Sequence, residues 1–152
     1  MLHDFQLAGK RVRLWQRTGE SYEHILMKAL GFAMFVKKYP MLEIETKVGL
    51  RYKPDLVARN SKGDFLFWGE AGANSLCKTV WLLKHTRTQK LVLFKIGQNA
   101  AMLIEQLRDE IPIKYRQPDR FSLVNFVDEI NQLTVSKQIA KVSRDWFTEF
   151  EI

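Results

Sequence analysis

Alternating apolar and polar residues predict several β-strands in the first half of the chain. Residues 41–48 carry an apolar or threonine side chain at every second position between charged residues, the pattern of a half-exposed strand. Residues 54–59 and 64–70 predict two further strands, and the turn residues at 60–63 join them into a hairpin. The opening segment 5–17 alternates more loosely and predicts an edge strand.

Helical spacing of apolar residues predicts three longer helices. Residues 21–39 have the broad apolar face that is typical of a largely buried helix. Residues 75–86 predict a second helix that follows a turn, with Asn74 or Ser75 as its N-cap. A third helix is predicted at 100–111, where apolar residues again recur at helical spacing.

A continuous apolar run at 90–96 predicts a central strand that is buried on both faces. Because a helix separates it from the strand at 64–70, the two are expected to pair in parallel through a right-handed crossover. The last third of the chain predicts a strand at 121–126 and a short helix at 127–133. The order helix, three strands, helix, strand therefore predicts a single α/β domain over residues 1–152, with a mixed sheet, flanking helices and extra C-terminal strands.

The composition is that of a globular protein, with 46% apolar and 27% charged residues. The single cysteine, Cys77, excludes an intramolecular disulfide and favours a reducing compartment. The first twenty residues resemble no signal peptide, and the longest apolar stretch, Leu30–Val36, is too short to span a bilayer. These features predict a soluble, cytoplasmic protein without a membrane partner.

The charge balance favours an acidic partner. The formal net charge is +7 and the pI is about 9.6, so nucleic acid is a possible partner. Basic residues on solvated faces give the same balance, so the charge does not identify the partner. The three histidines and one cysteine do not pair at ligand spacing, which argues against a zinc site. The sequence leaves the oligomeric state open.

Two acidic residues stand among apolar neighbours at predicted strand ends. Asp55 follows Pro54 and opens one strand of the hairpin, and Glu70 closes the aromatic strand that follows. Burying a carboxylate in such surroundings is costly unless it is paired, hydrogen-bonded or bound to a metal. The hairpin brings both residues to the same open end, where matched register puts them on one face. Their oxygen ligands suit Mg²⁺ or Mn²⁺.

This arrangement resembles the PD-(D/E)xK nuclease superfamily. The resemblance is carried by Pro54-Asp55 and by Glu70 after a turn and an aromatic strand. It implies the restriction-endonuclease-like core of helix, three strands, helix and strand. It also implies that Asp55 and Glu70 hold a metal ion that activates a water for phosphodiester cleavage.

A closer resemblance is to the YaeQ family, a bacterial group with that fold. It is carried by the acid-rich segment Gly19–Glu23 leading into Leu30–Met34, and by Phe67–Gly72 before a helix with basic residues. The resemblance covers about residues 18–135. In the superfamily an acid on the first helix often completes the metal site, which makes Glu20 and Glu23 additional candidate ligands.

One position departs from the superfamily pattern. A lysine is expected two residues after the glutamate, and position 72 is glycine, as in the YaeQ family. The resemblance implies that a lysine of the following helix replaces it. Lys78 fits best because it lies one turn into that helix, with Lys84 and Lys95 as further candidates. The expected role of this lysine is electrostatic, to stabilise the attacking hydroxide or the phosphorane-like transition state.

Each of these residues also has a purely structural explanation. Asp55 is a common turn residue, Glu70 can cap the next helix or pair with an arginine, and Glu20 and Glu23 are favourable at a helix start. Lys78 can simply be solvated. Two functions therefore remain open: a Mg²⁺-dependent phosphodiesterase that acts on nucleic acid, and a catalytically inactive binding or regulatory protein on the same fold.

Overall fold

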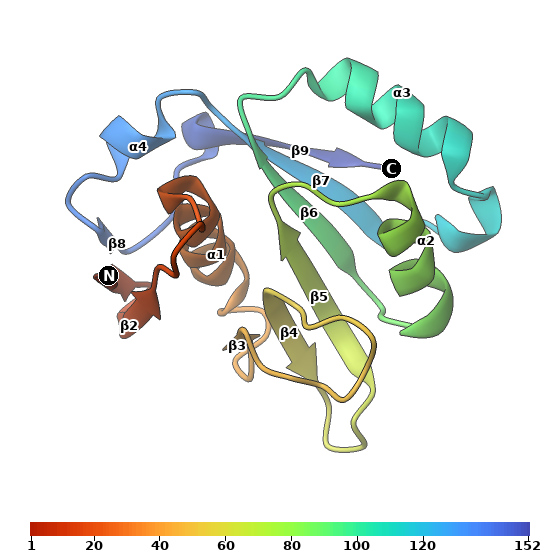
Figure 1. Ribbon diagram of the computed structural model, residues 1–152, viewed down its shortest axis with the longest axis horizontal. Helices are drawn as coiled ribbons and strands as arrows, with labels where there is room; N and C mark the ends of the chain where they lie inside the picture. The colour runs from red at the N-terminus through yellow and green to blue at the C-terminus, as the bar shows by residue number, and fades with distance from the viewer.

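The computed structural model describes residues 1–152 and contains two β-sheets (Figure 1). The larger sheet has the order β3-β4-β5-β6-β7-β9 and the smaller one the order β2-β1-β8. The strands are β1 (Leu2–Leu7), β2 (Lys10–Trp15), β3 (Glu43–Ile44), β4 (Leu56–Arg59), β5 (Phe65–Ala71), β6 (Leu91–Ile96), β7 (Phe121–Phe126), β8 (Gln138–Ile139) and β9 (Phe147–Glu151). The helices are α1 (Tyr22–Phe35), α2 (Leu76–His85), α3 (Ala100–Glu110) and α4 (Ile130–Leu133), with 3-10 turns at Ile113–Tyr115 and Arg144–Trp146.

The large sheet is mixed, as predicted. Strands β5, β6 and β7 pair in parallel at its centre, whereas β3, β4 and β9 join antiparallel toward its edges. The order α1, β3, β4, β5, α2, β6 is the predicted order of helix, three strands, helix and strand. Strand β6 is flanked on both sides, which agrees with its continuous apolar sequence.

Helices cover both faces of this sheet (Figure 1). On one face, α1 and the small sheet enclose the larger core cluster, which includes Phe5, Phe67 and Phe94. On the other face, α2 and α3 pack over a second cluster that includes Trp68 and Leu93. None of the helices combines the length and the apolar character needed to cross a bilayer.

The sequence prediction was wrong in two segments, and it gave no bounds for the strand at the C-terminus. Residues 5–17 belong to a β-hairpin, β1–β2, because Ala8 and Gly9 both have positive φ and form a tight turn. The strand predicted at 41–48 is only β3, because Glu45 has a φ of +56° and leaves the extended conformation. The C-terminal tail forms β9, which pairs with β7 over five residue pairs.

Gly31 sets how closely α1 approaches the sheet. A Cβ at this position would lie 2.7 Å from Leu56 Cδ1 and 2.9 Å from Phe94 Cζ. Both neighbours are buried, so neither can move freely out of the way. The absence of a side chain therefore allows the close contact between α1 and strands β4 and β6.

We expect Gly31→Ala to destabilise the protein despite its better helix propensity. Overpacking costs about 1–3 kcal/mol, whereas alanine gains about 1 kcal/mol in a helix interior, so a net loss of about 1 kcal/mol is expected in urea unfolding. Leu56→Ala would lower stability by itself because it opens a cavity. In the double variant the two losses should be less than additive, because the cavity accommodates the new methyl group. Additive losses would contradict the contact.

Candidate functional site

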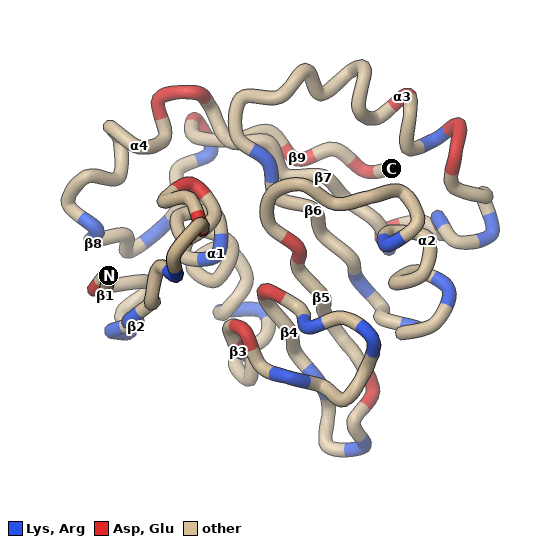
Figure 2. The backbone as a smooth tube through the Cα atoms, viewed as in Figure 1, with Lys and Arg blue, Asp and Glu red and all other residues tan.

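Asp55 and Glu70 occupy opposite positions at the ends of two paired strands. Leu56 of β4 pairs with Gly69 of β5, so the next residues outward along this register are Asp55 and Glu70. The Asp55 amide donates to the Gly69 carbonyl at 3.2 Å, and the Asp55 carbonyl accepts from the Glu45 amide at 2.9 Å. The backbone therefore fixes Asp55 between β3 and β5. In Figure 2, the acidic stretches at the start of β4 and in β5 lie close together.

The Asp55 carboxylate is directed toward α1. Its Oδ2 atom accepts the amide of Ala71 at 2.8 Å and lies 3.4 Å from His24 Nε2. Burial alone would raise the pKa of Asp55, but the hydrogen bonds from His24 and Ala71 outweigh it and lower that pKa. The same contact raises the pKa of His24. Asp55 is therefore an ionised carboxylate whose hydrogen bonds all use one oxygen.

The Glu70 carboxylate contacts α2. Its Oε1 atom accepts from Trp68 Nε1 at 2.9 Å, and its Oε2 atom lies 3.2 Å from Lys78 Nζ. Only 3% of this side chain is exposed. Burial and the nearby charge of Asp55 raise the pKa of Glu70 from 4.5 to about 7, against the opposing effects of Trp68 and Lys78. Glu70 therefore changes its charge near neutral pH.

Glu20 forms the centre of a network that sequence reasoning did not anticipate. Its Oε2 atom accepts from His24 Nδ1 at 2.6 Å and from Lys28 Nζ at 2.8 Å. Lys28 has no exposed side-chain surface and also donates to Glu45. Burial alone would raise the pKa of Glu20, but the hydrogen bonds from Lys28, the Arg17 amide and His24 lower it to about 2.

His24 and Lys28 are thus the two residues of this region that the sequence prediction missed. A signal was present: with Glu20 they form a polar series at four-residue spacing that crosses an otherwise apolar helix. His24 connects Glu20 to Asp55. The predicted acid of the first helix therefore reaches the strand-end acids through an imidazole.

Two of the predicted residues lie elsewhere. Glu23 is exposed and accepts a hydrogen bond from Asn131 in the segment of α4. Lys84 is exposed in the last turn of α2, whereas Lys78 lies in its first turn beside Glu70. The structure thus brings together Glu20, Asp55, Glu70 and Lys78, and leaves Glu23 and Lys84 outside this group.

Position 72, just after β5, is a glycine where the superfamily pattern has a lysine, and Lys95 lies next to it. Gly72 has a φ of +83°, a backbone conformation in which a lysine would be strained. Lys95 lies one position beyond the last β5–β6 pair, Ala71 with Phe94, and its ammonium donates to the Gly72 carbonyl. Burial lowers the pKa of Lys95. A second lysine therefore reaches the end of β5 from the neighbouring strand.

The carboxylates of Asp55 and Glu70 are chemically suited to a hard cation, but their present arrangement does not form a metal site. Carboxylate oxygens are suitable ligands for Mg²⁺ or Mn²⁺. No group of three or more Asp, Glu, His or Cys side chains is arranged to hold a metal ion. Both oxygens of Glu70 are already engaged, by Trp68 and Lys78, whereas Asp55 keeps Oδ1 outside its hydrogen bonds. A cation bound to Glu70 would lie near the Lys78 ammonium, so movement of Lys78 away from Glu70 would favour metal binding.

A small cavity adjoins the α1 side of this group. It has a volume of about 300 Å³ and lies between the start of α1 and the loop after β5, with Glu20, His24 and Gly72 among its lining residues. The loop also holds Asn74, whose side-chain nitrogen is buried without a partner, while Ser75 provides the N-cap of α2. Ser75, rather than Asn74, is thus the cap of the predicted pair.

The raised pKa of Glu70 predicts a pH-dependent stability. Because the folded carboxyl binds its proton more tightly than the unfolded one, wild-type stability should fall as pH rises from about 4.5 to about 7. Glu70→Gln has no such proton to lose, so in EDTA at pH 8 it should be more stable than the parent by up to about 3 kcal/mol, since one pKa unit corresponds to about 1.4 kcal/mol. The advantage should vanish at pH 4.5. Thermal melts of both proteins, with the exposed Glu23→Gln as control, test this; a destabilised variant at pH 8 would contradict it.

The comparisons with known proteins agree with the fold. No family model and no curated protein matches the sequence. Among solved structures, the YaeQ protein from Xanthomonas axonopodis pv. citri superposes with a TM-score of 0.64 at 17% identity, covering 89% of this chain and 77% of that protein. The YaeQ protein from Pseudomonas syringae gives 0.61 at 13% identity, with coverage of 96% and 89%. This chain is therefore YaeQ-like in fold.

Proposed function

We propose that this protein is a divalent-metal-dependent phosphodiesterase of the PD-(D/E)xK class that acts on nucleic acid. The observation that carries the proposal is the pair of largely buried carboxylates, Asp55 and Glu70, at the ends of β4 and β5 with Lys78 beside it. Like charges held together out of water cost stability, as the raised pKa of Glu70 reflects. Sites that keep such a cost are commonly functional.

The roles of the side chains follow from their contacts. Asp55, fixed by the backbone and by His24, and Glu70, freed from Lys78, would hold the cation. When bound, Mg²⁺ or Mn²⁺ would polarise the phosphodiester and lower the pKa of a water molecule. Lys78 would then carry its positive charge to the phosphate, where it stabilises the charge that develops in the transition state. The ion pair between Lys78 and Glu70 thus represents the resting arrangement.

Glu20 has a supporting role in this proposal. Its pKa of about 2 keeps it anionic at any physiological pH, so it can orient His24 and retain the proton on that ring. His24 in turn contacts Asp55. Carboxylate–imidazole–carboxylate chains of this kind fix the direction of a ligand oxygen. Glu20 therefore contributes through His24 rather than as a direct ligand.

A second candidate function is a binding or regulatory protein that has lost the chemistry. The observation in its favour is that the acids already have cationic partners: Lys28 and His24 for Glu20, and Lys78 for Glu70. Such a protein would need no metal, and the ion pairs would serve stability alone. Metal binding and cleavage separate the two functions.

If the first function is correct, cleavage of plasmid or single-stranded nucleic acid should require Mg²⁺ or Mn²⁺. Asp55→Asn and Glu70→Gln should abolish cleavage, and Lys78→Ala should reduce it by roughly a hundredfold or more through loss of transition-state stabilisation. Lys10→Ala, which removes an exposed lysine of β2 on the smaller sheet, is the matched control and should cleave normally. Equal activity in all four variants would assign the cleavage to a contaminant.

Metal binding should also appear as stabilisation. Mn²⁺ at about a hundred times its dissociation constant should stabilise the folded parent by roughly 2.7 kcal/mol, because the ion binds the folded state. The shift in melting temperature should be much smaller for Asp55→Asn and Glu70→Gln, whereas Glu23→Gln should behave like the parent. Absence of any Mn²⁺ effect, together with no cleavage, would favour the binding protein.

A further inference from the structure

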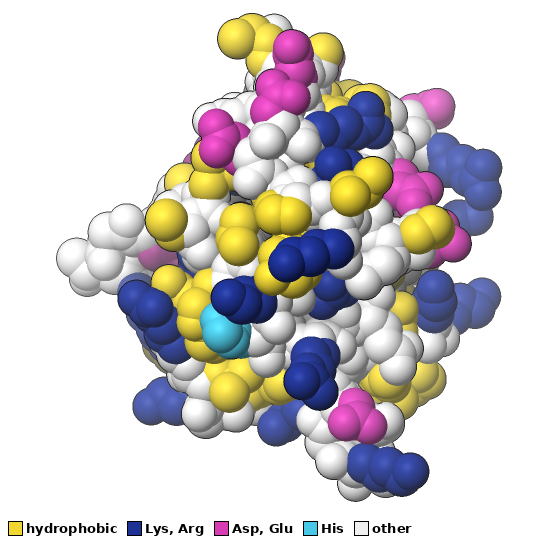
Figure 3. Space-filling model, turned by 90° about the vertical axis from the view of Figure 1, so that its right-hand side faces the viewer, with side chains coloured by type: hydrophobic (Ala, Val, Ile, Leu, Met, Phe, Trp, Pro, Cys, Tyr) yellow, Lys and Arg dark blue, Asp and Glu magenta, His cyan; other side chains and the backbone are white.

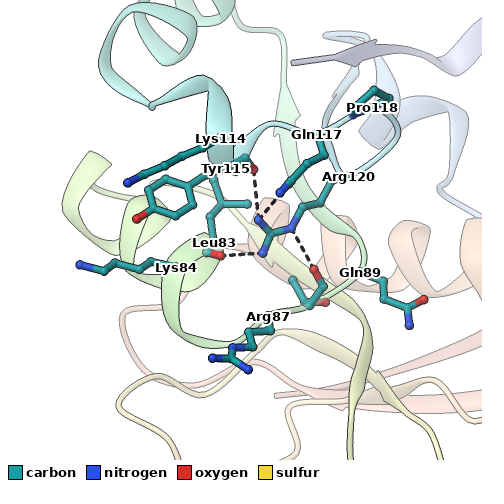
Figure 4. Close-up of a pocket in the computed structure, with 10 residues that line it drawn as sticks. Leu83, Lys84, Arg87, Gln89, Lys114, Tyr115, Gln117, Pro118 and Arg120 are labelled. Carbon is teal, nitrogen blue, oxygen red and sulfur yellow. Dashed lines mark hydrogen bonds between the residues drawn. The ribbon is translucent and has the colours of Figure 1, made fainter.

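The C-terminal end of α2 borders a cleft lined by cations (Figure 4). The cleft has a volume of about 550 Å³ and lies between α2, the loop after it, and the segment around Ile113–Tyr115. Its ten lining residues include Lys84, Arg87 and Lys114 and no carboxylate. None of these three residues takes part in an ion pair.

A fourth cation, Arg120, forms the floor of this cleft. Its guanidinium donates to the main-chain carbonyls of Leu83, Thr88 and Tyr115, as the dashed lines in Figure 4 show. These contacts join the end of α2 to the segment that carries Lys114. Arg120 is therefore structural, and it holds the two walls in place, while Lys84 and Lys114 extend from those walls to the same side in Figure 4.

A row of aromatic rings connects this cleft to the Asp55–Glu70 pair. The rings of Tyr52 and Trp81 have centroids 5.2 Å apart, and those of Trp81 and His85 are 5.0 Å apart. The Lys78 ammonium lies 5.2 Å from the centre of the Tyr52 ring. Lys84 and His85 are exposed, and Trp81 and Tyr52 are half-buried. The row therefore follows α2 from the residue that contacts Glu70 to the cationic cleft.

This surface combines cationic side chains with aromatic rings. The two kinds of side chain can bind different parts of a nucleic acid. Cations take phosphate groups, and aromatic rings stack on bases whose faces are free. In a duplex the base faces are covered by their neighbours, so the rings would have no partner. Figure 3 shows this side of the molecule, where Lys and Arg side chains gather at the height of α2 and below it, and acidic side chains lie mainly higher up and toward the edges.

We propose that the α2 surface, comprising Tyr52, Trp81, Lys84, His85, Arg87 and Lys114, binds single-stranded nucleic acid. Phosphates occupy the cationic cleft, and bases stack on the row of Tyr52, Trp81 and His85. That the bound nucleic acid runs toward the Asp55–Glu70 pair rests on the proposed function. The binding itself does not require cleavage or a metal ion.

The cationic part is tested by the salt dependence of binding. Fluorescence anisotropy of a labelled fifteen-nucleotide deoxythymidine strand is measured in EDTA over a range of NaCl concentrations. The triple variant Lys84→Ala, Arg87→Ala, Lys114→Ala should bind more weakly, and the slope of log K against log salt should flatten by about 2, since each lost phosphate contact removes roughly 0.7. The control triple Lys10→Ala, Lys37→Ala, Lys141→Ala removes three exposed lysines elsewhere and should keep the parental slope.

The aromatic part is tested on the same strand at fixed salt. Trp81→Leu should weaken binding by roughly tenfold, the effect of losing one stacked base. Because Trp81 and Tyr52 both pack partly against the core, His85→Ala, which removes an exposed ring of the row, serves as a second variant and should also weaken binding. Trp15→Leu removes a tryptophan that is 63% exposed on the small sheet and should bind like the parent.

Several outcomes would overturn the proposal. Equal loss in both lysine triples would mean that total charge alone drives binding. A duplex of the same length that binds as tightly as the single strand, or aromatic variants that bind like the parent, would remove the stacking surface. Absence of binding by the parent would do the same. Binding that needs this surface in a protein that never cleaves would leave the inference intact and remove the proposed function, whereas cleavage without such binding would do the reverse.

Discussion

A single buried ammonium group determines how α1 meets the sheet. Lys28 has no exposed side-chain surface, and its charge is balanced by Glu20 before the helix and Glu45 after β3. Removing both acids would leave a buried charge without compensation, which commonly costs several kcal/mol. Glu45 follows β3 and has a positive φ, and its carboxylate accepts a hydrogen bond from Lys28. The ion pairs of Lys28 and the backbone conformation of Glu45 thus depend on each other, and together they help to place α1 so that His24 contacts Asp55.

The surroundings of Glu20 and Glu70 shift the pKa values of these two identical side chains in opposite directions. Glu20 accepts from two cationic side chains and a main-chain amide, and its pKa falls to about 2. Glu70 is less exposed and stands near the charge of Asp55, and its pKa rises to about 7. Pairs of carboxyl groups with separated pKa values are how one fold supplies a permanent anion and a proton carrier at the same pH. Here the separation arises from α1 on one side of the sheet end and α2 on the other.

The sequence predicts those features of the fold that depend on local pattern. The apolar run of β6, the cap at Ser75 and the hairpin of β4 and β5 each follow from residues that are neighbours in the chain. The features it did not predict depend on distant partners or on a backbone choice. Glu45 interrupts an alternating sequence because its carboxylate binds Lys28, and the bounds of the expected C-terminal strand depend on its pairing with the distant strand β7.

The candidate site divides in the same way. Asp55, Glu70 and Lys78 were found because strand-end acids and a helix-start lysine converge for reasons of topology. Glu23 was grouped with Glu20 because two acids three residues apart are equally plausible in sequence; in the structure Glu20 contacts His24, whereas Glu23 contacts Asn131. His24 and Lys28 were missed because a histidine and a lysine in a helix are usually solvated. Their meaning depends on burial, which the pattern alone does not reveal.

Helix α2 connects the Asp55–Glu70 pair to the cationic cleft, because it carries a lysine beside each of them. Lys78 and Lys84 are six residues apart, so the rise of a helix sets them about 9 Å apart along its axis. Its buried side, with Leu82 and Leu83, packs on the sheet beneath Trp68, and Arg120 fixes its last turn to the segment after α3. The helix backbone therefore fixes the spacing between the points from which these two lysine side chains extend. The distance between the Glu70 carboxylate and the cationic cleft is therefore a property of the fold, and any extended ligand that contacts both must match that length.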